Sequence, residues 1–203
     1  MFTIMNDEGE TSLVEEPSSD CTYTYADYLQ WKFEERLELF KGKIFKLAAP
    51  NTKHQVILMR LQLRIGGFFE NTPCFVFVAP YDVRLPVKNR KKDNEITTVV
   101  QPDLGIVCEA SKIDERGCCG APDLVVEILS PGNSQKEVQL KFELYEEAGV
   151  KEYWIINPVE ENIVVFILNE EGKFGGGRMY AGKTISPHFI PELRIQVRDI
   201  FTN

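Results

Sequence analysis

The chain contains no long apolar segment. None of its apolar runs approaches the roughly 18 to 20 residues that are needed to cross a bilayer. Its first 20 residues are acidic, whereas a secretory signal begins with basic residues and continues with apolar ones. We therefore expect a cytoplasmic protein without a membrane-spanning segment.

The chain also lacks a cysteine pattern that is typical of disulfide-rich or zinc-binding proteins. Its five cysteines are an odd number, and no two of them have C-x-x-C spacing. One adjacent pair cannot complete a tetrahedral zinc site without spaced partners. We therefore predict neither a disulfide framework nor a zinc site, and we expect the protein to reside in a reducing compartment. The five residues concerned are Cys21, Cys74, Cys108, Cys118 and Cys119.

Basic residues are not in excess, and the net charge of −8 argues against a nucleic-acid partner. The first 20 residues, however, hold six acidic and no basic side chains, so residues 21–203 carry 25 acidic against 23 basic ones, a net charge of −2. We predict a disordered acidic tail over residues 1–20 and a single, nearly neutral domain over residues 21–203. The basic residues that either contact phosphates or only face solvent are Lys88, Arg90, Lys91 and Lys92 in a loop, and Lys53, Arg60 and Arg64 on a helix.

Hydrophobic periodicity predicts an α/β domain. Residues 37–47 have the pattern of a hairpin that turns at Gly42. Helices are predicted over residues 52–69, ended by the pair Gly66-Gly67, and over residues 135–148, ended by Gly149. Further strands are predicted over residues 74–78, 81–85, 104–108, 124–129, 152–156 and 162–168.

Acidic residues accompany two of these apolar strands. Asp103 precedes the strand at 104–108, and Glu127 lies inside the strand at 124–129. If the two strands pair as an antiparallel hairpin, these carboxylates meet at one end, where they repel each other and lose hydration. Mg²⁺, which prefers one or two carboxylates together with waters and phosphate oxygens, compensates this charge, and the backbone carbonyl of Ile128 is a further candidate ligand. The alternatives are a strand-end cap for Asp103 and a structural ion pair for Glu127.

A lysine interrupts the apolar face of the second long helix. Lys141 lies in the predicted inward stripe, three residues after Val138 and four before Tyr145. Its side chain either extends outward along the surface to solvent or points its ammonium group at the two acids. In the second case it stabilises charge on a phosphoryl group or orients a water.

Three segments resemble a bacterial family of restriction endonucleases within the PD-(D/E)XK nuclease superfamily, and the resemblance covers about residues 24–200. The segments are Gln101-Pro102-Asp103-Leu104, Ala121 to Pro131, and Lys141 to Pro158. The resemblance implies a restriction-endonuclease-like fold, a mixed sheet flanked by helices, with Asp103 and Glu127 as metal ligands and Glu38 as an accessory acid. His54 fits a histidine of the family, although we expect it to be a hydrogen-bonded helix residue rather than a catalytic one.

The chain departs from the superfamily pattern at one position. The pattern acid-x-Lys places a lysine two residues after the second acid, and here Leu129 stands there. The family resembles cases in which this lysine has moved to the next helix, which makes Lys141 the candidate.

We therefore predict a Mg²⁺-dependent or Mn²⁺-dependent endonuclease that acts on DNA, with Asp103, Glu127, Lys141 and Glu38 in its active site. A homodimer is expected, because cutting both strands needs two centres and two-fold assemblies are common. The alternatives are a nucleic-acid-binding or regulatory module on the same fold that does not cut, and a protein-interaction domain.

Overall fold

The computed structural model describes residues 2–5, 11–14, 22–31, 36–87, 92–131 and 134–202 of the chain. The helices are α1 (Tyr25–Tyr28), α2 (Thr52–Phe69), the 3-10 helix η1 (Ala110–Lys112), α3 (Gln135–Ala148) and α4 (Arg198–Phe201). The strands are β1 (Phe2–Met5), β2 (Thr11–Val14), β3 (Leu37–Phe40), β4 (Lys43–Lys46), β5 (Phe75–Val78), β6 (Val83–Arg84), β7 (Val99–Val100), β8 (Leu104–Val107), β9 (Ile113–Asp114), β10 (Gly117–Cys119), β11 (Leu124–Ile128), β12 (Glu152–Asn157), β13 (Asn162–Ile167), β14 (Arg178–Ala181), β15 (Thr184–Ile185) and β16 (Ile195–Gln196).

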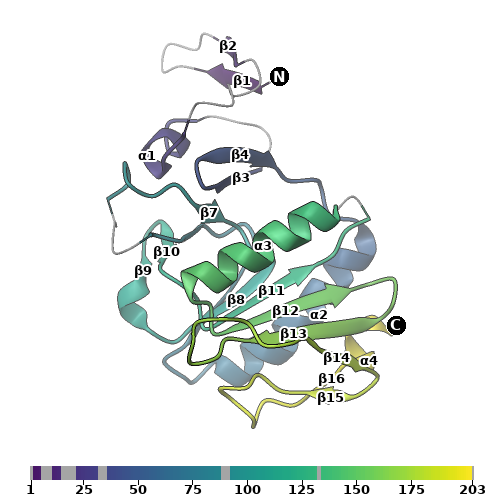
Figure 1. The fold of residues 1–203 in the computed structure, drawn as a ribbon. Coiled ribbons are helices and arrows are strands. Elements are labelled where there is room, and N and C mark those ends of the chain that lie inside the picture. Colours follow the sequence, from purple (N-terminus) through teal and green to yellow (C-terminus); the bar gives the residue numbers. More distant parts are fainter. Residues whose placement is uncertain are drawn as a thin grey trace.

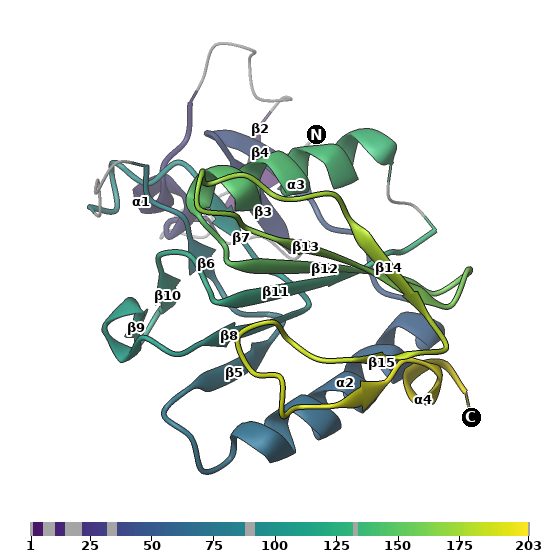
Figure 2. The ribbon, with the colours of Figure 1, turned by 60° about the horizontal axis from the view of Figure 1, so that its bottom comes forward.

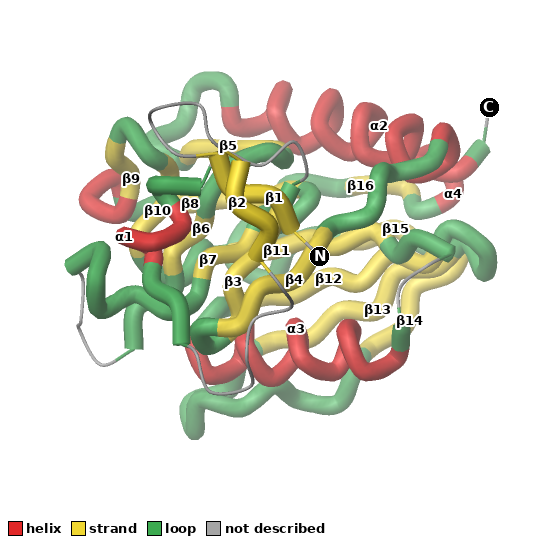
Figure 3. The backbone as a smooth tube through the Cα atoms, turned by 90° about the horizontal axis from the view of Figure 1, so that it is seen from above, coloured by secondary structure: helices red, strands yellow, loops and turns green. Residues whose placement is uncertain are grey.

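A six-stranded mixed sheet forms the centre of the fold, with the strand order β14-β13-β12-β11-β8-β5. Helix α3 covers one face of this sheet, and α2 covers the other together with α4 and the β15–β16 ribbon (Figures 1 and 2). Seen from above, α2 and α3 lie on opposite sides with the strands between them (Figure 3). The predicted mixed sheet flanked by helices is confirmed.

The register of the central strands brings the two predicted acids together. Strand β8 pairs with β11 in antiparallel fashion, with Leu104 opposite Val126. The next position along each strand therefore places Asp103 opposite Glu127, as the sequence predicted. Strand β11 then continues through α3 into β12, which runs parallel to it. A parallel pair needs such a crossover, and the crossover carries Lys141 over the sheet.

Alternation along β11 directs its side chains to both layers of the fold. Val126 belongs to the apolar cluster on the α2 side, which also contains Ile57. Val125 belongs to the cluster on the α3 side, together with Tyr145. Glu127 shares the parity of Val125 and therefore lies beneath α3.

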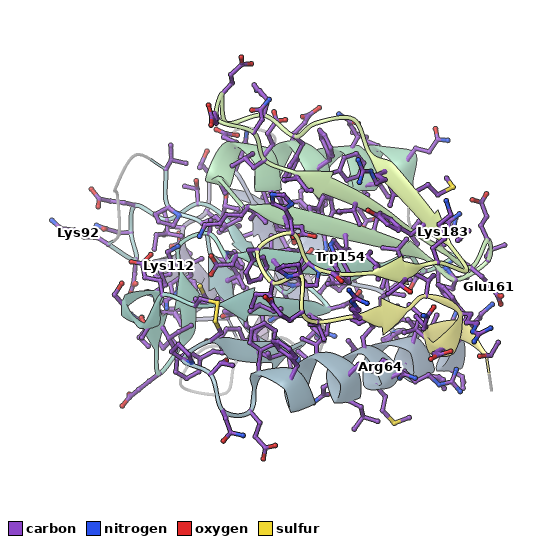
Figure 4. The ribbon with its side chains drawn as sticks, turned by 90° about the horizontal axis from the view of Figure 1, so that it is seen from below. Arg64, Lys92, Lys112, Trp154, Glu161 and Lys183 are labelled. Carbon is purple, nitrogen blue, oxygen red and sulfur yellow. A yellow bond between two sulfur atoms is a disulfide. The ribbon has the colours of Figure 1, made fainter. Side chains whose placement is uncertain are left out.

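Side chains fill the space between the sheet and the α2 layer, where Figure 4 labels Trp154. Trp154 is fully buried, and its indole N–H donates a hydrogen bond to Oε1 of Glu152 at 2.6 Å. The other oxygen of this carboxylate accepts from the backbone N–H of His188 at 2.6 Å. Burial raises the pKa of Glu152, and the two donors partly oppose that rise. The carboxylate thus fastens the segment around His188, on the way to α4, to the central sheet.

A second six-stranded sheet, in the order β4-β3-β7-β6-β10-β9, packs beside the first. Its β3–β4 hairpin turns through two residues with positive φ, Lys41 at 49° and Gly42 at 80°, which is the backbone that two-residue hairpin turns favour. The hairpin predicted at Gly42 is confirmed. Strand β3 is buried along its whole length, which places Glu38 inside the fold.

The glycine pair does not end α2, contrary to the prediction. The helix continues through Gly66 and Gly67 to Phe69. Ile65 and Phe69 are both buried in the core on the α2 side, and their packing outweighs the cost of about 1 kcal/mol per glycine in a helix.

The expectation that the chain forms no disulfide is also wrong. The structure bonds Cys74 to Cys108. Strands β5 and β8 pair with Phe75 opposite Val107, so these two cysteines face each other at the ends of the strands. They are 34 residues apart in the sequence, and their spacing therefore carries no signal.

Within the predicted acidic tail, β1 pairs with β2 in antiparallel fashion. Both segments contain β-branched and apolar residues that favour strands. The rest of residues 1–20 lies outside the described residues, so disorder of the tail as a whole stays a prediction. In the part of the chain that the structure describes, no helix has the length and apolar character required for a membrane span.

Candidate active site

A cavity of about 200 Å³ opens where the β3–β4 hairpin, the start of α2, the central sheet and α3 meet. Asp103 and Glu127 lie in its wall, with Lys141 from α3 and Ile128 from β11. The remaining lining residues are Arg36, Lys46, Leu47, Ala48, Pro50, His54, Gln55, Leu58, Ala79, Gln101, Ser130 and Glu137. Residues from five separate parts of the chain therefore share one pocket.

Lys141 joins two buried carboxylates. Its Nζ donates to Oε1 of Glu127 at 2.9 Å and to Oε1 of Glu38 at 3.2 Å. The exposed fractions of the side chains are 9% for Lys141, 12% for Glu127 and 1% for Glu38. The predicted orientation of Lys141 toward the acids is thus observed, and the alternative in which it extends to solvent is not.

Tyr145 completes this cluster from the next turn of α3. Its hydroxyl donates to Oε1 of Glu127 at 2.6 Å. Burial, followed by the nearby charges of Glu127 and Glu38, raises the pKa of Tyr145 well above its ordinary value, so the hydroxyl remains a donor. The backbone N–H of Gln101 donates to Oε1 of Glu38 at 2.8 Å and fixes the carboxylate on the far side of Lys141.

Asp103 is held by a different set of donors. Its Oδ2 accepts from the backbone N–H of Ile128 at 2.7 Å and lies 3.1 Å from Nε2 of His54. His54 is buried at the first turn of α2, whose N-cap Asn51 accepts from its backbone N–H. The prediction that His54 is a hydrogen-bonded helix residue is consistent with this contact, and the contact fixes one oxygen of Asp103.

The electrostatics of the cluster follow from its burial. Desolvation raises the pKa of Glu127 to about 7; Lys141 opposes this rise, while Asp103 and Glu38 add to it. Burial alone disfavours charge on Lys141, but the attraction of Glu127 and Glu38 outweighs it and raises the pKa of the ammonium group. The site therefore holds a fixed positive charge among three carboxylates that share limited hydration.

The site offers oxygen ligands that suit a hard divalent cation, but it offers few of them. The hydrogen bonds described above engage only one oxygen each of Asp103 and Glu127, which leaves the second oxygen of each for a ligand. Oε2 of Glu38 is buried without a hydrogen bond, although Nζ of Lys141 lies 3.2 Å away. Within the described ranges no three His, Cys, Asp or Glu side chains gather as a metal site. Two carboxylates and a cavity that admits water suit Mg²⁺, which keeps several waters.

Sequence reasoning missed several polar residues at this site. Tyr145 does not line the cavity but contacts Glu127, and its position four residues after Lys141 places it on the same helix face. Gln101 shares strand parity with Asp103, which is a signal that could have identified it. Arg36 and Lys46 gave no signal, because only the pairing of β3 with β4 brings them to the cavity.

Other candidates from the sequence lie elsewhere. Asp123 accepts from the backbone N–H of Cys108 at 2.8 Å and from Lys151 at 2.6 Å, which agrees with its structural interpretation. On α2, Arg60 and Arg64 donate to backbone carbonyls of α4, so they fasten that helix. Of the basic loop, Lys88, Arg90 and Lys91 lie outside the described residues, and Lys92 is exposed.

Comparisons with known proteins agree with this picture. Residues 25–198 match the model of the Uma2 family, described as "Putative restriction endonuclease". An uncharacterized protein of Synechocystis sp. is 24% identical over 149 residues, which are 72% of this chain and 74% of that protein. A crystal structure from Anabaena variabilis, titled a "putative nuclease belonging to DUF820", superposes with a TM-score of 0.69 at 22% identity and covers 88% of this chain and 97% of the other. That likeness shows a shared fold.

Proposed function

This chain belongs to the Uma2 family of restriction-endonuclease-like proteins, and from that premise we propose that it is a metal-dependent endonuclease that hydrolyses phosphodiester bonds in DNA. One observation carries the proposal. Asp103 and Glu127 stand opposite each other in one cavity, and Lys141 is buried against the second of them. Purely structural carboxylates are rarely placed in this way, because each costs several kcal/mol to desolvate.

The free oxygens of Asp103 and Glu127 would hold Mg²⁺ or Mn²⁺, and the backbone carbonyl of Ile128 is a third candidate ligand. Bound Mg²⁺ supplies Lewis-acid polarisation of a phosphoryl oxygen and lowers the pKa of a water. Asp103 is oriented for this task by the N–H of Ile128 and by His54. Glu127 is oriented by Tyr145.

Lys141 is the group that would contact the reacting atoms. Its ammonium is positioned by Glu127 and Glu38 and keeps its proton, so it donates to an attacking water or to a negatively charged phosphoryl oxygen. Glu38 acts through Lys141, since its carboxylate lies behind the ammonium and is fixed by Gln101. In this proposal Lys141, on the helix, has the role that the lysine of the acid-x-Lys pattern has elsewhere in the superfamily.

The test is incubation of purified protein with supercoiled plasmid in Mg²⁺ or Mn²⁺. We expect nicked and then linear DNA, and loss of cutting by at least about 100-fold in Asp103→Asn, Glu127→Gln and Lys141→Met. Glu170→Gln, which changes an exposed acid, is the matched control and retains activity. Cutting by Asp103→Asn and Glu127→Gln at the rate of the parent protein would refute the proposal.

A second candidate function is a nucleic-acid-binding module that does not cut. Leu129 favours it, because this residue occupies the position of the superfamily lysine. A gel shift in Ca²⁺ separates the two, since a binder retards DNA and loses affinity steeply with salt even when no nicking occurs. We further propose a homodimer, for which sedimentation at increasing concentration is the measurement.

A further inference from the structure

The cavity is lined by both acidic and basic side chains. Of these, Glu127 and Lys141 are buried, whereas Arg36 is partly exposed and Lys46 is exposed. Arg36 immediately precedes β3, and Lys46 ends β4, opposite Leu37. Both residues line the cavity, so the ends of the β3–β4 hairpin contribute two cations to the wall that also holds Asp103 and Glu127.

Arg36 is positioned by a neutral group. Its Nε and Nη2 both donate to Oε1 of Gln101 at 3.0 Å. Among the described residues no ion pair neutralises this guanidinium, because its partner here is an amide. An arginine fixed through one edge keeps its charge and its remaining N–H donors for an anion.

Gln101 is itself fixed by a chain of hydrogen bonds. Its Nε2 donates to Oδ1 of Asp82 at 2.9 Å and to the hydroxyl of Tyr28 at 3.2 Å. Asp82 also accepts from Tyr25 at 3.4 Å and from Tyr28 at 3.2 Å. Because Asp82 only accepts, the amide must present its nitrogen to Asp82 and its oxygen to Arg36. This network fixes Arg36 at the cavity, and burial and the nearby Asp82 raise the pKa of Tyr28, which keeps its hydroxyl protonated.

We propose that Arg36, together with Lys46, binds a backbone phosphate of the nucleic acid next to the phosphate that meets Asp103 and Glu127, and that Gln101 is the positioning residue for Arg36. The inference rests on the proposed function, since it assigns a second phosphate to the same substrate. It makes the ligand a polyanion with at least two adjacent phosphodiesters. The two cations receive the flanking phosphate, while the acids repel it.

The experiment measures DNA binding without cutting, in Ca²⁺, by fluorescence anisotropy of a labelled duplex between about 50 and about 200 mM KCl. Each phosphate contact adds about 0.9 to the slope of log affinity against log salt. Arg36→Gln and Lys46→Gln should each weaken binding several-fold near about 100 mM salt, and the variant that carries both changes should reduce that slope by about 1, because the two residues bind one phosphate. Arg36→Lys keeps the charge but loses the two-pronged contact with Gln101, so it should keep the slope and weaken binding less.

Lys183→Gln is the matched control, because Lys183 is an exposed lysine next to β15 (Figure 4) and is not among the residues that line the cavity. Thermal unfolding of each variant verifies its fold. A parent slope in the variant that carries both Arg36→Gln and Lys46→Gln would overturn the inference, and so would a parent protein that does not bind the duplex. If the parent protein nicks plasmid while that variant keeps the parent slope, the proposed function stands and only the proposed phosphate contact is refuted.

Discussion

Lys141 is the counter-charge of two buried carboxylates, so its loss should be costly even before activity is measured. Lys141→Met leaves Glu127 and Glu38 without a cation, and breaking a buried pair in this way destabilises by about 3 to 5 kcal/mol. We expect the melting temperature to fall by roughly 10 °C, as measured by circular dichroism. Added Mg²⁺ should raise the melting temperature of this variant more than that of the parent, because it supplies the missing positive charge.

The control for this change is Lys136→Met, since Lys136 is exposed on the same helix. It should melt within about 2 °C of the parent protein, as surface substitutions usually do. If Lys141→Met melted with the control, the ammonium group would not be the partner that stabilises these carboxylates.

Glu127 should give the proposed metal site a pH dependence. Its pKa is raised to about 7 by burial, and a carboxylate must lose its proton to bind a metal. Metal affinity should therefore fall as the pH is lowered from about 8 to about 6. The hydrogen bond from Tyr145 opposes the rise in this pKa, so Tyr145→Phe should move the midpoint to higher pH and weaken metal binding several-fold near pH 7. Calorimetric titration with Mn²⁺ at a series of pH values measures the metal affinity and the midpoint of its pH dependence.

The useful control for this titration is Tyr180→Phe, because Tyr180 lies on β14 and has no part in the cavity lining. Its midpoint should match that of the parent. A midpoint for Tyr145→Phe that matched the parent, or lay below it, would contradict the role given to the Tyr145 hydroxyl.

The sequence predicted those site residues that stand out from the apolar pattern of their neighbours in the chain. Asp103 and Glu127 stand beside apolar strands, and Lys141 interrupts an apolar helix stripe, so periodicity alone singles them out. Arg36 and Gln101 are 65 residues apart and meet only through the pairing of β3 with β7 and the hydrogen bonds around it. No local pattern contains that information.

Among the elements, α2 carries two glycines that its packing does not need. A Cβ built on Gly66 or Gly67 meets nothing within 4 Å, and neither residue has a positive φ. Alanine at either position should therefore stabilise the protein by about 0.5 to 1 kcal/mol, because glycine loses more backbone entropy on folding. Urea denaturation of the two single variants and the double variant measures this gain.

Gly105→Ala provides the opposite case for comparison. A Cβ on Gly105 would overlap the ring of Phe77, which packs across β8, so this change should destabilise by about 1 to 3 kcal/mol. The Gly66 and Gly67 variants could instead lose stability by an amount that depends on protein concentration. That result would show that another chain covers this face of α2.

The longest elements were predicted from the sequence, and several of the shortest were not. The bounds of α3 and the pairing of β8 with β11 agree with the structure, because α3 has apolar residues at helical spacing and the two strands are continuous apolar runs. The two-residue strands β7 and β16 have no period to detect. Their positions depend on neighbouring strands of the second sheet and of the C-terminal ribbon, which are distant in the sequence.

For the whole molecule, the distribution of charge matters more than its sum. The six acids of the first 20 residues account for most of the net charge of −8, and DNA is a polyanion. Replacing these acids by their amides leaves a net charge of −2, so we expect tighter binding and faster association with DNA at low salt. The gain should be several-fold near 50 mM salt and should vanish near 1 M, where the Debye length is about 3 Å.

The matched control exchanges each tail aspartate for glutamate and each glutamate for aspartate, which changes the side chains and keeps the charge. This control should bind as the parent does at every salt concentration, and anisotropy in Ca²⁺ measures all three proteins. If the amide variant bound no better than the charge-conserving control near 50 mM salt, long-range repulsion by the tail would not limit access of DNA to the cavity. If both variants bound better than the parent, the tail would act through specific side-chain contacts, because the control retains every negative charge.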